Sequence, residues 1–238
     1  MFRLFSFFVL SGVKYLSSVF YRFDVTWLSK QSAVNWKEVK LIVFLNHTSL
    51  FEPIFIRVAP NSFIWRLSRN LVVPGADVTL NRPIVGRFFK TIVPGAVSIS
   101  RKRDSSWNRF MEKITPQSVV AILPEGRMKR KNGLDKHGKP MSVRGGVADI
   151  LHNMNEGNAL FVYSGGLHHI QSPGQILPKI FKQVKVNLEL INIEQYKQLI
   201  KAKSSTLKEF RRNLVEDLEQ KLRSRIPLDN IAEKESTK

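Results

Sequence analysis

A histidine and a carboxylate five residues apart form the first pattern in this sequence that could do chemistry. His47 and Glu52 lie in the segment NHTSLFEP, residues 46–53. A neutral imidazole, with a pKa of about 6.5, can take a proton from a hydroxyl group at neutral pH. A carboxylate on the other ring nitrogen would fix the tautomer and stabilise the imidazolium that forms. We therefore interpret His47 as a candidate general base and Glu52 as the group that orients it.

The spacing of this pair tests the interpretation. On a regular helix, five residues turn the chain by about 500°, which leaves the two side chains about 140° apart. They can meet only if a turn leads into a helix, with His47 before or in its first turn. The alternative is a capping arrangement, in which Asn46, Thr48 or Ser49 caps a helix that carries Glu52 in its first turn.

Two further clusters combine glycine, cations and a carboxylate. In the first, the apolar segment 95–99 is followed by Arg101, Lys102 and Arg103. Arginine offers paired donors and lysine a point charge, so this cluster suits a phosphate, although a solvated basic loop would have the same sequence. The second is LPEGRMKRK, residues 123–131, where Gly126 permits a tight turn beside a ligand. An ordinary polar loop or a nucleic-acid patch are the alternatives there.

The elements that must position these groups alternate between strand and helix patterns. Val39–Leu45 is a nearly continuous apolar run, typical of a buried strand, and residues 184–190 alternate like a half-buried one. Further strands are expected at 96–100, 119–123 and 159–163, and helices at 50–58, 84–91, 106–114 and 146–154. A last helix begins after Thr206, with leucines on one face. This order predicts an α/β fold, a mixed or mainly parallel sheet flanked by helices.

Composition narrows the function classes. The 238 residues include no cysteine, which excludes disulfides, thiolate metal sites and thiol catalysis. Lys and Arg total 38 against 19 acidic residues, a formal charge of +19 that predicts attraction to nucleic acid, an anionic membrane or an acidic protein. No Walker loop, dinucleotide fingerprint or nucleophile elbow occurs, and we expect no metal site.

The N-terminal residues favour a membrane among these partners. Residues 1–22 are apolar and aromatic, but Lys14 and several serines interrupt them, and a spanning helix needs about 20 mostly apolar residues. We expect an interfacial or shallowly inserted helix, with a membrane span and a signal peptide as alternatives. We divide the chain into a membrane-associating segment, 1–30, one folded domain, 31–226, and a disordered tail, 227–238.

In order and spacing, the three blocks resemble those of the PlsC-type lysophospholipid acyltransferases, also called the glycerolipid acyltransferase family. The resemblance covers about residues 39–170. That family has Asn-His, four residues, then Asp, where this chain has Asn46, His47 and Glu52. It has a glycine followed six residues on by arginine, similar to Gly95 and Arg101. Its third block, Phe-Pro-Glu-Gly-Thr-Arg, is similar to LPEGRM, residues 123–128.

The resemblance implies an O-acyltransferase. His47 would be the base on an acceptor hydroxyl that attacks an acyl thioester directly, and Glu52 would orient it. The substrate-binding residues that it implies are Asn46, Arg101, Glu125, Gly126 and Arg127. It implies no cofactor apart from the acyl donor, which is acyl-CoA or acyl carrier protein. It also implies a membrane lipid substrate and a location at the membrane, on the cytoplasmic face of the inner membrane.

Three positions depart from the family pattern. Glu52 is one methylene longer than the usual Asp, Met128 replaces an arginine, and Ser98 replaces a phenylalanine. These departures leave open an acceptor other than 1-acylglycerol-3-phosphate, namely another lysophospholipid or a lyso-aminolipid. The alternatives are a catalytically weak membrane-bound relative and a basic nucleic-acid-binding protein. We expect no nucleic-acid partner, because no such motif is recognised and the apolar N-terminus would have no role in one.

Overall fold

A computed structural model of the protein describes residues 2–29, 34–81, 83, 85–93, 95–100, 104–172, 175 and 177–227. The strands are β1 (Tyr21–Trp27), β2 (Val39–Leu45), β3 (Leu71–Ala76), β4 (Gly95–Ile99), β5 (Val119–Ile122), β6 (Asn158–Ser164) and β7 (Lys182–Asn192). The helices are α1 (Phe2–Phe20), the 3-10 helix η1 (Glu52–Val58), α2 (Asn61–Asn70), α3 (Asp77–Leu80), α4 (Val85–Ile92), α5 (Ser106–Glu112), α6 (Gly146–Asn153), α7 (Ile193–Lys201) and α8 (Leu207–Arg225).

Within the described residues, seven strands form one sheet in the order β1-β7-β6-β2-β5-β3-β4. Each neighbouring pair is parallel except β6 and β7, which are antiparallel. The sheet is therefore mixed and mainly parallel, which confirms the predicted fold class. Because β2, β5 and β6 are adjacent and parallel, their carboxyl ends lie together at one edge of the sheet.

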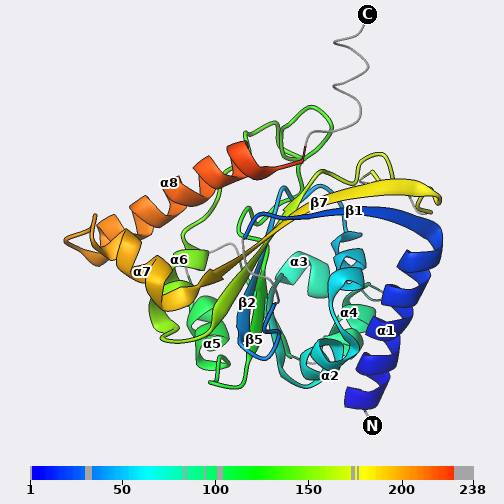
Figure 1. Cartoon of the computed structure of the whole chain (residues 1–238), viewed down its shortest axis with the longest axis horizontal. Helices are drawn as coiled ribbons and strands as arrows, with labels where there is room; N and C mark the ends of the chain where they lie inside the picture. The colour runs from blue at the N-terminus through cyan, green and yellow to red at the C-terminus, as the bar shows by residue number, and fades with distance from the viewer. Residues whose placement is uncertain are drawn as a thin grey trace, which may run out of the picture.

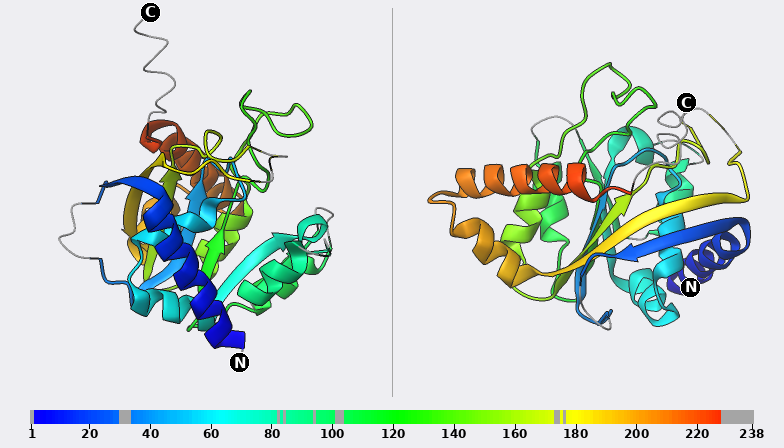
Figure 2. Two further views of the ribbon diagram at one scale, coloured as in Figure 1. Left: turned by 90° about the vertical axis from the view of Figure 1, so that its right-hand side faces the viewer. Right: turned by 45° about the horizontal axis from the view of Figure 1, so that its top comes forward.

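Helices cover both faces of the sheet (Figures 1 and 2). Helices α1, η1, α2 and α4 pack on one face, and α5 to α8 pack on the other. Residues of β2 alternate between the two cores: Leu41, Val43 and Leu45 join the second, and Val39 and Ile42 join the first. This burial on both faces explains why the β2 sequence is almost continuously apolar.

The predicted strands and the later helices are confirmed, with ends that differ by a few residues. The helix expected at 50–58 is instead a 3-10 helix that starts at Glu52. Five elements were not predicted: β1, α2, β3, α3 and α7. Strand β3 escaped because Pro74 and Gly75 are turn signals. Pro74 is tolerated there because β3 pairs with β5 only over Leu71 and Val72, and beyond them with β4 alone.

The N-terminal segment supplies part of the sheet as well as a helix. Helix α1 ends at Phe20, and β1 starts at the next residue and pairs with β7. Of the described helices, one stretch, Arg3–Phe20 in α1, is long and apolar enough to cross a membrane. The boundary at residue 30 stays a prediction, and the predicted tail lies outside the described residues from 228 onward.

Helix α8 has the start and the face that its sequence predicts. The Thr206 hydroxyl accepts a hydrogen bond from the backbone N–H of Glu209 at 3.2 Å, and the Glu209 carboxylate accepts one from the N–H of Ser205 at 2.7 Å. Phe210, Leu214 and Leu218 are buried against the sheet. Reciprocal capping and a buried apolar stripe thus set this helix locally.

Candidate active site

Asn46 turns the chain at the carboxyl end of β2. Its φ of 66° lies in the left-handed region, which asparagine tolerates better than most residues. Its side-chain amide donates to the carbonyl oxygen of Ser164 at 2.8 Å, and its side-chain oxygen accepts from Lys129 Nζ at 2.8 Å. Asn46 therefore joins the ends of β2, β6 and the loop after β5, and both of its side-chain groups have protein partners.

His47 and Glu52 meet as the candidate pair requires. His47 Nδ1 lies 3.0 Å from Glu52 Oε1. The same oxygen accepts the backbone N–H groups of Thr48 and Ser49, each at 3.1 Å. The turn before η1 brings the two side chains together, because residues 47–51 are not helical. The capping alternative is right that Glu52 lies in the first turn of η1, but the N-cap residue is Phe51, which makes no side-chain capping hydrogen bond. The Glu52 carboxylate instead accepts the upstream amides of Thr48 and Ser49.

The geometry leaves one imidazole nitrogen for a substrate. Nδ1 lies at ion-pair distance from the Glu52 carboxylate, and His47 Nε2 has no hydrogen bond within the described part of the chain. Burial lowers the pKa of His47, but the charge and hydrogen bond of Glu52 and the charge of Glu125 outweigh it and raise the pKa above its ordinary 6.5. The side chain of His47 is 13% exposed, so the base is open at one side.

Glu125 holds the backbone that carries His47. Its Oε1 accepts the N–H of Asn46 at 2.6 Å and that of His47 at 3.3 Å. Its Oε2 is buried without a hydrogen-bond partner among the described residues, and the residue is 1% exposed. Burial raises the pKa of Glu125, and the two amides offset part of that rise. Glu125 is therefore placed to position the base, a role that the block spacing did not indicate.

Two substitutions of Glu125 should show whether its hydrogen-bond acceptor or its negative charge matters more. We expect Glu125→Ala to lower the free energy of unfolding by about 1–3 kcal/mol, because two buried N–H groups lose their acceptor. It should also lower acyl transfer more than Glu125→Gln, which keeps an amide oxygen for the same bonds. Chemical unfolding and initial rates of the two variants check this. Equal damage by Gln and Ala would show that the charge matters and the acceptor does not.

The residues that follow Glu125 in the third block contact other residues of the same loop. Gly126 has a φ of 66°, and a Cβ there would lie 3.2 Å from Cδ of Arg144, so glycine fits the turn. The Arg127 guanidinium pairs with the buried Asp135. Arg144 Nε donates to the carbonyl oxygen of Glu125 at 3.3 Å. Gly126 thus directly follows the residue that binds the His47 backbone, whereas Arg127 is engaged within its own loop.

The predicted second block is described only in part. Gly95 starts β4, where a Cβ would lie 2.1 Å from the carbonyl oxygen of Leu71, so close packing of β3 against β4 requires glycine. Arg101 lies outside the described residues. The part of this block that the structure describes is therefore an edge of the sheet.

Two sets of contacts at the site were missed by sequence reasoning. Lys129 donates its backbone N–H to the carbonyl oxygen of His47 at 2.7 Å, besides its bond to Asn46. The segment after β6 holds the other side: Leu167 N–H donates to Thr48 Oγ1 at 2.8 Å, and the Ser49 hydroxyl donates to Gln171 at 2.5 Å. The signal was available, since β6 also ends in a polar, glycine-containing segment at the same edge.

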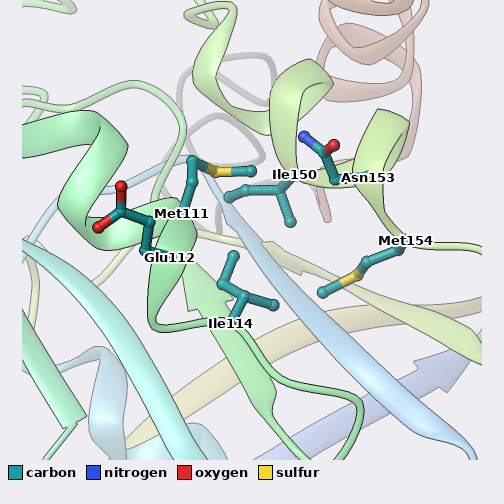
Figure 3. A pocket seen from close by; sticks show the side chains of 6 residues that line it. All are labelled: Met111, Glu112, Ile114, Ile150, Asn153 and Met154. Carbon is teal, nitrogen blue, oxygen red and sulfur yellow. The ribbon is translucent and has the colours of Figure 1, made fainter.

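The cavity drawn in Figure 3 is not part of this site. It has a volume of about 290 Å³ and is lined by Met111, Glu112, Ile114, Ile150, Asn153 and Met154. These residues end α5 and α6 or follow them, and they lead into the amino ends of β5 and β6. The cavity therefore lies toward the edge of the sheet opposite His47. No group of three or more His, Asp or Glu side chains that could hold a metal occurs among the described residues.

Comparison with known proteins places this geometry in a family. The family model described as Acyltransferase matches residues 24–170, which contain His47, Glu52 and Glu125. A search of curated proteins gave no match. Among solved structures, the 1-acyl-sn-glycerophosphate (LPA) acyltransferase PlsC from Thermotoga maritima is similar, with 16% sequence identity and a TM-score of 0.51 over 92% of this chain and 81% of that one. The chain therefore belongs to the acyltransferase family and has a PlsC-like fold.

Proposed function

We propose that this protein transfers a fatty acyl group from a thioester to the hydroxyl of a lysophospholipid, with 1-acylglycerol-3-phosphate as one candidate acceptor. The observation that carries the proposal is the His47–Glu52 pair: 3.0 Å between Nδ1 and Oε1, with Nε2 directed away from the carboxylate. Membership of the acyltransferase family supports the same reaction.

The reaction needs one base and an activated acyl group. His47 Nε2 takes the proton of the acceptor hydroxyl as its oxygen attacks the thioester carbonyl carbon. The new C–O ester bond forms, the C–S bond breaks, and the departing thiolate receives the proton from the imidazolium. Glu52 keeps Nδ1 as the protonated nitrogen before the attack and stabilises the imidazolium during it. No acyl-enzyme is formed in this scheme.

The loop between β5 and α6 favours an anionic substrate group. Its cations include five exposed residues, Arg130, Lys131, Lys136, Lys139 and Arg144. Its two acids, Glu125 and Asp135, are both buried, and Asp135 accepts hydrogen bonds from Arg127 and from the amides of His137 and Lys139. The exposed charge is therefore positive and lies on the loop whose Lys129 contacts His47. We propose that the phosphate of the acceptor binds here, with Lys129 and Arg144 in place of the arginine that Met128 replaces.

The donor and the location complete the proposal. Acyl-CoA and acyl carrier protein are both anionic, and the basic loop suits either. We propose that the protein works at a membrane, on its cytoplasmic face, because a lysophospholipid acceptor resides there and α1 is long and apolar enough to enter a bilayer.

Acyl transfer by the purified protein tests the proposal. Labelled acyl-CoA and acyl carrier protein are offered against lysophospholipids with different headgroups, with His47→Ala as the matched blank. Product from the wild type alone identifies donor and acceptor together. Absence of product from every pairing, with folded protein, would contradict the proposed reaction.

A further inference from the structure

Two adjacent histidines follow strand β6 and bind different parts of the fold. His168 Nε2 lies 2.7 Å from the carbonyl oxygen of Lys129, and His169 Nε2 lies 2.7 Å from that of Gln183. A carbonyl oxygen can only accept, so Nε2 carries the proton and donates in both residues. Gln183 belongs to β7, whereas Lys129 belongs to the loop after β5 that contacts His47. His168 is therefore the member of the pair that reaches the candidate active site.

Lys129 is bound through three of its polar groups. Its N–H donates to the carbonyl oxygen of His47 at 2.7 Å, and its Nζ donates to Asn46 Oδ1 at 2.8 Å. These two bonds join Lys129 to the turn after β2. Its carbonyl oxygen accepts from His168, which joins it to the segment after β6. Both backbone groups of Lys129 thus have fixed partners, and the position of its ammonium group depends on them.

The segment that carries His168 also binds the turn after β2 directly. Leu167 N–H donates to Thr48 Oγ1 at 2.8 Å, and the Ser49 hydroxyl donates to Gln171 Oε1 at 2.5 Å. Within the segment, the N–H of Gln171 donates to the carbonyl oxygen of Leu167 at 2.8 Å, which closes a short turn. The same turn therefore contacts the residues directly after the candidate base and, through His168, the basic loop.

The strand order explains why this contact is a long-range one. Strand β2 lies between β6 and β5 in the sheet, and all three are parallel. At a spacing of about 4.8 Å between neighbouring strands, β6 and β5 are about 10 Å apart. The bond from His168 to Lys129 therefore spans the carboxyl end of β2, where the turn that carries His47 begins.

We propose that His168 is a positioning residue that holds Lys129 where its ammonium group can bind the phosphate of the acceptor. An ammonium group has three donors, and Asn46 takes one of them, so two remain for phosphate oxygens. His168 donates to the main chain of Lys129 and so acts through Lys129 rather than on the substrate. The inference rests on the proposed function, which assigns the acceptor phosphate to this loop. It adds a residue that lies outside the three sequence blocks.

Transfer kinetics at saturating acyl donor test this role. We expect His168→Ala to raise the KM for a phosphate-bearing acceptor by roughly tenfold, because the loop loses one hydrogen bond. We expect kcat to fall by less than about threefold, because His47 keeps its contacts to Glu52 and Glu125. His168→Gln should restore most of the KM, since glutamine also ends in an N–H donor. His169→Ala is the matched control and should keep both constants.

A double substitution shows whether the effect passes through Lys129. In a Lys129→Ala protein, adding His168→Ala should raise KM by less than about twofold further, because the ammonium group that His168 positions is already absent. An equally large increase with and without the Lys129 side chain would contradict the proposed route.

Hydrogen exchange provides a readout that needs no acyl transfer. The Lys129 amide is bound to the His47 carbonyl oxygen, so we expect it to exchange faster in His168→Ala and at the wild-type rate in His169→Ala. A wild-type protein that transfers no acyl group would contradict the proposed function. An active wild type whose folded His168→Ala variant keeps the wild-type KM would instead overturn this inference, and so would unchanged exchange of the Lys129 amide in that variant.

Discussion

His47→Ala is expected to lower acyl transfer by about a thousandfold or more while the fold stays intact. General-base catalysis by a positioned side chain contributes roughly 10²–10⁴-fold, and direct attack of a hydroxyl on a thioester leaves His47 as the group that accepts the proton. The His47 side chain is polar and 13% exposed, and it lies just beyond the end of β2, so the fold should tolerate alanine there. The kcat of the variant and its thermal unfolding midpoint, measured beside the wild type, check both halves of this prediction.

His152→Ala is the control, because it removes a histidine side chain that lies away from the candidate active site. His152 is exposed on α6, and its ring contacts Phe210 far from the carboxyl edge of the sheet. We expect it to keep the transfer rate of the wild type. A folded His47→Ala protein with full activity would remove His47 from the role of base, whatever the family assignment.

Glu52→Gln should cause the second-largest loss, about a hundredfold or more, whereas Glu52→Asp should keep most of the activity. A glutamine cannot balance the imidazolium, and its amide group can present a donor to Nδ1, which favours the wrong tautomer. Aspartate keeps the charge and matches the residue usual in the family block. Initial rates of the three proteins test this, and equal rates for Gln and Glu would show that no carboxylate is needed.

Glu52→Gln should also move the pH dependence of acyl transfer to lower pH. The neutral imidazole is the active form, so activity rises as pH passes upward through the His47 pKa, which Glu52 and Glu125 raise above 6.5. Without the Glu52 charge, the pKa of His47 falls, and the acidic limb of the rate profile moves to lower pH. NMR titration of the His47 ring measures the shift independently of activity.

The contribution of the His47–Glu52 pair to stability should fall as pH rises, whereas activity rises. Because the folded-state pKa of His47 is raised, the protonated His47–Glu52 contact contributes its full stability below about 6.5 and loses it as pH rises through the folded-state value. The free energy of unfolding of the wild type should therefore fall more across this range than that of Glu52→Gln. A parallel pH dependence in the two proteins would indicate that the pair is not coupled.

Local sequence determined much of the architecture. Continuous apolar residues identified β2, alternation identified the centre of β7, and capping spacing with an apolar stripe identified α8. The His47–Glu52 pair was also predictable, because its two members lie within one turn and depend on the short segment between them. Periodicity, capping and close spacing are properties of neighbouring residues, so the sequence alone can carry them.

Tertiary structure decided which partner each polar side chain has. Glu125 binds amides at Asn46 and His47, far away in the chain, because β2 and β5 pair in parallel and end together. Arg127 meets Asp135 rather than the site, while Lys129 reaches Asn46 and Ser6 and Ser17 of α1 face the domain. The contacts of a carboxylate, a cation or a helix face depend on the strand order of the sheet and on how distant segments pack. Those long-range choices leave no local pattern in the amino-acid sequence.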